Sequence, residues 1–196
     1  MPSPATHITG YLYGIQLPLT YGIPVVLMDQ WDKDSAVEII LRWECTFTVG
    51  ATPFLQELCA AACTRNISLP SLKYFLCGGA PVPPDIIYES QAVLGRCIPG
   101  RVYGCTEAPT ITLGPTHIDQ LRDAAETDGK PIGYDLKLIG DDGLCAKAGD
   151  GEIAVRGPEV FLGYGDPVRD AEAFDAEGFF LTGDLGHMDV DGNLTI

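Results

Sequence analysis

Short apolar runs alternate with helical patterns through the first part of the chain, and this alternation restricts the fold more than any other feature of the sequence. We expect strands at 24–28, 46–49, 72–77 and 97–103. Their continuous aliphatic and β-branched character is typical of strands buried in a parallel sheet. Because the connections between strands and helices are short, we expect right-handed crossovers and a mainly parallel sheet.

Helical patterns occupy the stretches between these predicted strands. One begins after Asp34 or Ser35, residue types that cap helix N-termini, and a second runs over 54–63. A third runs over 84–94, with a proline at its start and Gly95 at its end. The sequence therefore predicts an α/β subdomain over residues 1–115.

The residue pattern changes after about Pro115, where glycine, aspartate and proline separate short apolar segments. Asp141-Asp142-Gly143 and Asp191-Gly192 are hairpin signals. Short strands are expected at 135–139, 151–156, 179–181 and 192–196. We therefore predict a small antiparallel, β-barrel-like subdomain over residues 116–196.

The chain is acidic, with 27 Asp and Glu residues against 12 Lys and Arg, which gives a formal net charge of −15. Of the acidic residues, 18 lie between Ile111 and Ile196, in the predicted β-rich region. A polyanion repels phosphate backbones and anionic lipid headgroups, which argues against nucleic acid and membrane surfaces as partners. No apolar run approaches the roughly 20 residues needed to cross a bilayer, so we expect no membrane insertion.

The cysteines indicate a reducing compartment. There are seven, an odd number, with no Cys-x-x-Cys pair and no N-terminal secretion signal. These features favour free thiols and a cytoplasmic location. The three histidines have no metal-ligand spacing.

Two loops that follow predicted strands carry residues suited to a nucleotide. Gly78-Gly79-Ala80-Pro81 would let a flat ligand approach the backbone, although an ordinary strand-to-helix turn explains it better when taken alone. Tyr103-Gly104-Cys105-Thr106-Glu107 combines an aromatic ring, a hydroxyl for phosphate and a carboxylate for Mg²⁺. Its alternative is a buried tyrosine followed by a tight turn.

Two further motifs are weak when considered singly. Thr182-Gly183-Asp184 follows an aromatic strand, and its carboxylate could accept both hydroxyls of a ribose or simply stand in a turn. Pro4-x-x-His7-x-x-Gly10 contains a lone histidine, a residue that more often has a structural role. No Gly-x-Ser-x-Gly elbow, His-Glu-x-x-His helix or Walker-type phosphate loop is present.

In this order the motifs resemble those of the AMP-forming acyl- and aryl-CoA synthetase superfamily, over essentially the whole chain. Residues 1–14 and 47–55 are most similar to cyclohexanecarboxylate–CoA ligase and related medium-chain acyl-CoA ligases. The motifs that carry the resemblance are Pro-x-x-His-x-x-Gly, Gly-Gly-Ala-Pro, Tyr-Gly-x-Thr-Glu, Gly-Lys-Pro-Ile-Gly (129–133), Gly-Glu-Ile-Ala-Val-Arg-Gly-Pro (151–158), Gly163-Tyr164 and Phe-Leu-Thr-Gly-Asp (180–184). The implied reaction joins a carboxylic acid to ATP, giving acyl-adenylate and pyrophosphate, and then to CoA, giving acyl-CoA and AMP.

The resemblance implies a nucleotide site made of residues from several motifs. Tyr103 would stack on adenine, with Gly79-Ala80-Pro81 along the other side of the base and Gly104 beside it. Thr106 would hydrogen-bond the phosphate, and Asp184 would hold the ribose hydroxyls. The implied ligands are therefore ATP and AMP, with CoA as co-substrate.

The same resemblance implies where the metal and the acid bind. Glu107 would bind Mg²⁺, and with Thr106 and His7 it forms the expected catalytic set. His7 would sit beside the acyl pocket, with Gly104 and Cys105 near the substrate carboxylate. The small Cys105 is compatible with a bulky or alicyclic acyl group, and the resemblance implies an alicyclic or medium-chain acid.

Two elements of the superfamily do not appear in these 196 residues. One is a phosphate-binding loop ending in Pro-Lys, and the other is a Gly-Arg-x-x-Asp hinge followed by a mobile domain. We therefore expect a central fragment holding half of a doubly wound sheet, inactive alone and prone to self-association. The alternatives are a subunit that pairs with a complementing chain and a non-catalytic adenylate-binding module.

Overall fold

The computed structural model describes residues 1–115 and 117–196. These fall into two compact units that interleave along the chain: Met1–Arg101 with Pro115–Glu126, and Val102–Gly114 with Thr127–Ile196. The predicted division after residue 115 stays a prediction, and residue 116 lies outside the described residues. Each unit is described by itself below.

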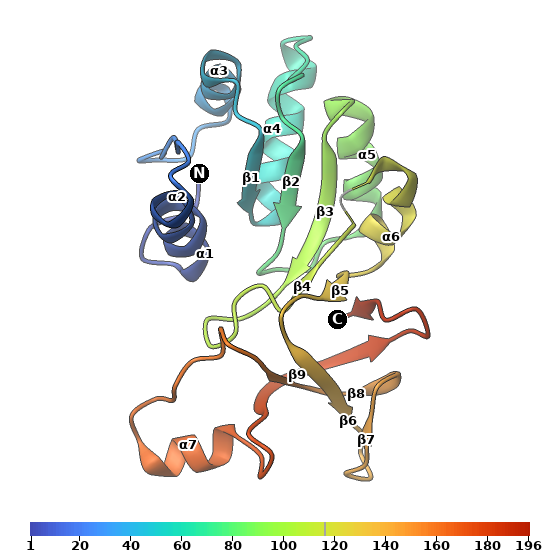
Figure 1. The fold of residues 1–196 in the computed structure, drawn as a ribbon. Helices are drawn as coiled ribbons and strands as arrows, with labels where there is room; N and C mark the ends of the chain where they lie inside the picture. The colour runs from blue at the N-terminus through green and yellow to red at the C-terminus, as the bar shows by residue number, and fades with distance from the viewer. Residues whose placement is uncertain (116) are drawn as a thin grey trace. The chain divides into compact units, whose positions relative to one another are not determined.

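The first unit contains the parallel strands that the alternating pattern predicts. β1 (Phe47–Gly50), β2 (Tyr74–Cys77) and β3 (Ile98–Tyr103) pair side by side in parallel, and β3 continues into the second unit. The crossovers contain α4 (Thr52–Thr64) and α5 (Pro84–Leu94), as Figure 1 shows. The α/β class and the parallel sheet are thus confirmed.

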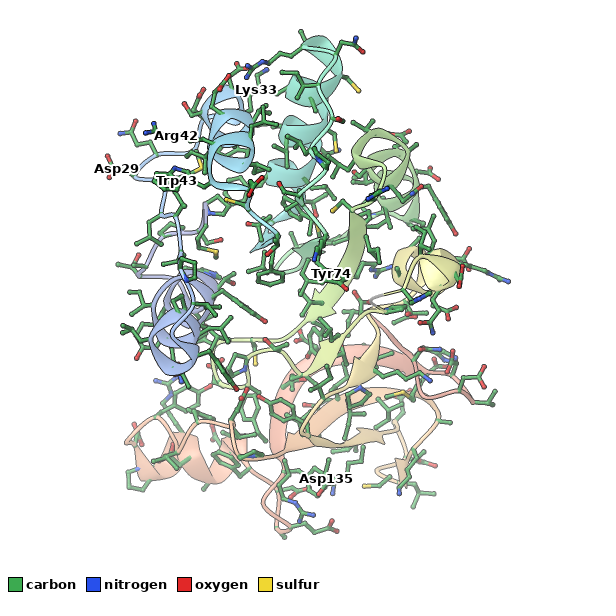
Figure 2. The ribbon with its side chains drawn as sticks, turned by 45° about the horizontal axis from the view of Figure 1, so that its top comes forward. Asp29, Lys33, Arg42, Trp43, Tyr74 and Asp135 are labelled. Carbon is green, nitrogen blue, oxygen red and sulfur yellow. The ribbon has the colours of Figure 1, made fainter. Side chains whose placement is uncertain are left out.

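A row of helices packs on this sheet. α3 (Lys33–Trp43), α4, α5 and α6 (Leu121–Glu126) contact one another in sequence, and Phe75 and Cys77 of β2 are buried among them. Arg42 and Trp43 stand at the C-terminal end of α3, where the guanidinium lies 5.3 Å from the indole centroid (Figure 2). The largest buried side chains of this core are Val37, Leu55, Leu58, Leu69, Leu72, Phe75 and Ile87.

The helical segment near the N-terminus changes its winding part-way. α1 (Ile8–Tyr11) leads into a π-helical turn, η1 (Leu12–Gln16), and then into α2 (Leu17–Tyr21). Pro18 has no amide hydrogen and its ring would clash with an ordinary helical turn before it. The wider π-helical turn, η1, lies directly before the α2 turn that contains this proline.

The strand predicted at 24–28 is wrong, because the structure describes these residues and assigns them no strand. Their backbone bonds to Met1 instead: the Met1 amino group donates to Val26 O at 2.7 Å, and Met28 N donates to Met1 O at 3.2 Å. Two such bonds do not form a ladder. The apolar side chains of Val25, Val26 and Met28 line a groove, which explains the apolar run without a strand.

That groove has a volume of about 490 Å³ and an apolar lining that includes Trp31, Trp43 and Phe47. Trp43 is 59% exposed and Leu27, nearby in sequence, 57%. Exposed apolar surface of this kind favours association. Self-association nevertheless stays a prediction.

Among the described residues, no helix combines the length and apolar character that a bilayer crossing requires.

The second unit is mostly antiparallel, as the Gly- and Asp-rich sequence predicts. The end of β3 pairs with β4 (Thr112–Leu113), which pairs with β5 (Lys130–Pro131). Asp135, labelled in Figure 2, begins β6 (Asp135–Ile139). A separate sheet has the order β10-β9-β8-β6-β7, formed by β6 (Asp135–Ile139), β7 (Cys145–Ala146), β8 (Gly149–Arg156), β9 (Phe180–Met188) and β10 (Leu194–Thr195).

The core of the second unit gathers around the inward faces of β8 and β9. Ile153 and Val155 are fully buried, and Phe180 is nearly so. Phe161 and Phe174 pack against Phe180, with ring centroids 5.2 and 5.9 Å away. This core supports the loop after β3 and the short helix α7 (Pro167–Ala173).

The Pro4-x-x-His7-x-x-Gly10 motif has a local steric explanation, which yields a prediction. A Cβ on Gly10 would lie 1.9 Å from the Pro4 carbonyl oxygen, so alanine requires a backbone shift. At Gly14, four residues along the same helical segment, a Cβ would meet only side-chain carbons of Met1 and Leu27 at 3.2 Å. We predict that Gly10→Ala lowers the free energy of unfolding by roughly 1–3 kcal/mol and that Gly14→Ala changes it less.

Urea unfolding followed by circular dichroism measures both variants. Equal stability of the Gly10→Ala variant and the unmodified chain would contradict the close packing of Gly10 on Pro4. The matched Gly14→Ala variant controls for the higher helix propensity of alanine.

Candidate functional site

A hydrogen bond in the second unit joins two of the residues singled out from the sequence. Tyr103 is the last residue of β3, and its hydroxyl donates to Asp184 Oδ2 at 2.7 Å. The two residues are 81 positions apart in the sequence. Only 9% of Tyr103 is exposed, so its ring offers little surface to a ligand, and stacking on adenine stays a prediction.

Asp184 stands in a bulge of β9. Glu152 of β8 pairs with Leu185 and Ala154 pairs with Leu181, so residues 182–184 all lie opposite Ile153. The Thr182 hydroxyl stabilises the bulge by donating to Ile153 O at 2.8 Å and accepting from Asp184 N at 3.1 Å. Bulges redirect side chains and are common beside active sites. The Thr-Gly-Asp motif thus orients the carboxylate instead of continuing the strand.

The surroundings of Tyr103 keep its phenol neutral. Burial raises the pKa of Tyr103 above its ordinary value. The Asp184 carboxylate adds to this rise and a hydrogen bond with Thr182 opposes it. A neutral phenol is a permanent hydrogen-bond donor, so the carboxylate of Asp184 keeps this partner through the physiological pH range.

The loop after Tyr103 turns tightly over its own backbone. A Cβ on Gly104 would lie 2.4 Å from Thr110 N, so glycine is required there by the turn itself. Cys105 N donates to Ala108 O at 3.1 Å, and burial raises the pKa of the Cys105 thiol. Thr106 is exposed, and its contact with a phosphate stays a prediction.

Glu107 is the carboxylate of this loop that the sequence assigns to a metal. It is half-buried, and its Oε1 accepts a hydrogen bond from the Tyr164 hydroxyl at 2.9 Å. Within the described residues, no group of three or more His, Cys, Asp and Glu side chains could hold a metal ion. A single carboxylate fits Mg²⁺ that arrives bound to nucleotide phosphates, since such sites use one or two carboxylates.

The other predicted residues belong to the first unit. Gly79-Ala80-Pro81 follows the C-terminal end of β2 and is exposed, with Gly79 at φ +76°. Pro81 O accepts a hydrogen bond from the Thr52 hydroxyl at 3.2 Å. His7 is exposed and caps α1, its Nδ1 accepting from Thr9 N at 3.2 Å. The cap is a structural role, and the nucleotide and acyl-pocket roles of these residues stay predictions.

Sequence reasoning missed the partners of the two carboxylates. It assigned Tyr103 to a base and Asp184 to a ribose, and did not foresee that they bond to each other. The Gly163-Tyr164 motif carries no expected role, although the Tyr164 hydroxyl donates to Glu107 Oε1. The only available signal was the presence of both motifs, because nothing in the spacing specifies a side-chain contact.

Comparison with known proteins supports the motif-based resemblance. Residues 1–165 match the sequence profile of the family described as AMP-binding enzyme. The medium-chain fatty-acid–CoA ligase of Escherichia coli is 35% identical over 199 residues, covering 100% of this chain and 35% of that protein. The indoleacetate–CoA ligase of Aromatoleum aromaticum is 32% identical, covering 98% of this chain and 38% of that protein. The chain thus spans about a third of the length of these relatives.

Solved structures agree. The N-terminal domain of FACL13 from Mycobacterium tuberculosis aligns with a TM-score of 0.88 and 26% identity, covering 100% of this chain and 49% of that one. O-succinylbenzoate coenzyme A synthetase (MenE) from Bacillus subtilis, in complex with ATP and magnesium ion, aligns with a TM-score of 0.86 and 27% identity, covering 100% and 40%. The expected fold class, a parallel-rich sheet followed by an antiparallel one, is therefore confirmed.

The buried phenol makes a prediction for alkaline pH. The unfolded chain releases the Tyr103 proton near pH 10, while the folded chain retains it, so stability falls as pH rises past about 10. Tyr103→Phe has no proton to lose, and we predict that it loses less stability than the unmodified chain between about pH 9 and about pH 11. Urea unfolding at both pH values measures this difference. The same loss in both proteins would contradict the raised pKa.

Proposed function

Because the chain belongs to the AMP-binding enzyme family and to the acid–CoA ligase lineage, we propose that it is part of an ATP-dependent, AMP-forming carboxylic acid–CoA ligase. The carboxylate of the acid would attack the α-phosphorus of ATP, releasing pyrophosphate and leaving an acyl-adenylate. The CoA thiol would then displace AMP to give the acyl-CoA. We propose a cytoplasmic location for the protein, because its cysteines are free thiols.

The observation that carries this proposal is the Tyr103–Asp184 hydrogen bond at the β9 bulge. It leaves Asp184 Oδ1 for the ribose hydroxyls while Oδ2 is held by the phenol. A carboxylate has about four acceptor positions, so holding one oxygen does not prevent it from binding a diol. We assign Asp184 to the ribose and Tyr103 to its orientation, with the exposed Thr106 at the phosphate.

Glu107 would hold Mg²⁺ on the nucleotide phosphates. When bound, the metal neutralises charge that builds on the leaving pyrophosphate. The chain's own contribution is to present Glu107 at a fixed position, since its loop is closed by the bond between Cys105 N and Ala108 O. Cys105, in the same loop, would lie beside the acid, and the acyl-pocket role of His7 stays a prediction.

A medium-chain or alicyclic acid is the proposed substrate. The support comes from the relatives: a medium-chain fatty-acid–CoA ligase is 35% identical to this chain, and a ligase for a ring-bearing propanoyl compound from Mycobacterium tuberculosis is 32% identical. The small side chain of Cys105 is compatible with a bulky or alicyclic acyl group.

A non-catalytic adenylate-binding module and a subunit of a complementing pair remain the alternatives, because the same carboxylates would serve both. Pyrophosphate release tests the expected inactivity of the chain alone. We expect none from this chain alone with ATP and a medium-chain acid, and release would show that these 196 residues suffice for the first step.

Calorimetric titration with AMP tests the nucleotide site. Asp184→Asn keeps an oxygen that accepts from Tyr103 but removes the charge, so we predict that the affinity for AMP falls roughly tenfold or more. Asp150→Asn is the matched control, because Asp150 is an exposed carboxylate of the same unit and pairs with His187 at 2.7 Å. Equal affinities in all three proteins, or no AMP binding by the unmodified chain, would overturn the proposal.

A further inference from the structure

Glu107 is held at its backbone and at its side chain by one distant segment of the same unit. Phe161 N donates to Glu107 O at 2.7 Å, and the Tyr164 hydroxyl donates to Glu107 Oε1 at 2.9 Å. Tyr164 is 57 residues from Glu107 in the sequence. The function proposed above leaves the Gly163-Tyr164 pair without a role. Tyr164 nevertheless contacts the carboxylate that the proposal assigns to the metal.

Tyr164 is itself fixed in place by its neighbours. Its ring packs edge-on against Phe161, with centroids 4.7 Å apart. The Arg169 guanidinium lies 4.2 Å from the ring centroid, and Tyr164 N donates to Asp170 Oδ1 at 2.6 Å. Arg169 and Asp170 both belong to α7, which Asp166 caps. The hydroxyl of Tyr164 is thus presented by a packed structure instead of by a free side chain.

The glycine before Tyr164 is required by this arrangement. Gly163 has φ +128°, a backbone conformation that side chains disfavour. A Cβ at this position would lie 2.9 Å from the nearest carboxylate oxygen of Asp170. The turn that brings Tyr164 N to Asp170 therefore excludes larger residues, and the pair Gly163-Tyr164 acts as one unit.

The bond to Tyr164 leaves Glu107 able to bind a cation. Within the part of the chain that the structure describes, no hydrogen bond reaches Oε2. Carboxylates that bind metals are commonly oriented by a hydrogen bond to the other oxygen, which fixes the ligand geometry.

We infer that Tyr164 is a positioning residue for Glu107. By holding the Glu107 carboxylate in one orientation, Tyr164 increases the gain in ATP affinity that Mg²⁺ gives this chain. The inference rests on the proposed function, since it takes Glu107 as the residue that meets the nucleotide-bound metal. The Tyr164 hydroxyl does not touch the metal itself. It acts by limiting the orientations of the Glu107 carboxylate.

The test compares the affinity of the 196-residue chain for ATP with Mg²⁺ and with EDTA. Tyr164→Phe removes only the hydroxyl and keeps the ring that packs on Phe161 and Arg169. We expect the Mg²⁺-dependent gain in affinity to fall roughly tenfold, with affinity in EDTA unchanged. Tyr134→Phe is the matched control, because that hydroxyl donates to Pro109 O of the same loop at 2.8 Å, and it should leave the Mg²⁺-dependent gain intact.

A double-mutant cycle with Glu107→Gln separates positioning from a merely structural role. In the Glu107→Gln background we expect Tyr164→Phe to have no further effect on the Mg²⁺-dependent gain. Additive effects, an equal loss in Mg²⁺ and EDTA, or an unchanged or larger gain in Tyr164→Phe would each overturn the inference and leave the nucleotide site intact. No ATP binding by the unmodified chain would overturn the proposed function, and the inference with it.

Discussion

The candidate site of this chain depends on the break in β9 opposite Ile153. If β9 paired with β8 without interruption, the side chains of residues 182–184 would point to alternate faces of the sheet. Asp184 would then occupy an ordinary strand position. The bulge, closed by the Thr182 hydroxyl, instead brings Asp184 to the Tyr103 hydroxyl at the end of β3. A local irregularity in one strand thus unites two motifs that are far apart in sequence.

Each carboxylate of the site accepts a hydrogen bond from a tyrosine hydroxyl. Asp184 accepts from Tyr103, and Glu107 accepts from Tyr164. A neutral phenol donates a strong hydrogen bond to an anion without cancelling its charge, so each carboxylate is oriented and remains available to a ligand. Lys or Arg in place of the two tyrosines would orient the carboxylates but would also neutralise their charge.

Much of the fold could be predicted because its signals are local. The helix at 84–94 and the strand at 135–139 were predicted with the bounds that the structure shows, since proline, glycine and apolar spacing mark their ends. The strand predicted at 24–28 is wrong, because local signals do not show whether a segment has a strand to pair with. The apolar residues of this segment line a groove instead. The Tyr103–Asp184 and Tyr164–Glu107 contacts are tertiary, and the motif types indicated chemistry without indicating these pairs.

A crystal structure of this chain with AMP tests the central claim most directly. The account predicts the ribose hydroxyls within hydrogen-bond distance, about 3 Å, of the Asp184 carboxylate, with the Tyr103 hydroxyl still bonded to Oδ2. AMP bound at another place on the chain, or a ribose that leaves Asp184 without a new contact, would contradict it.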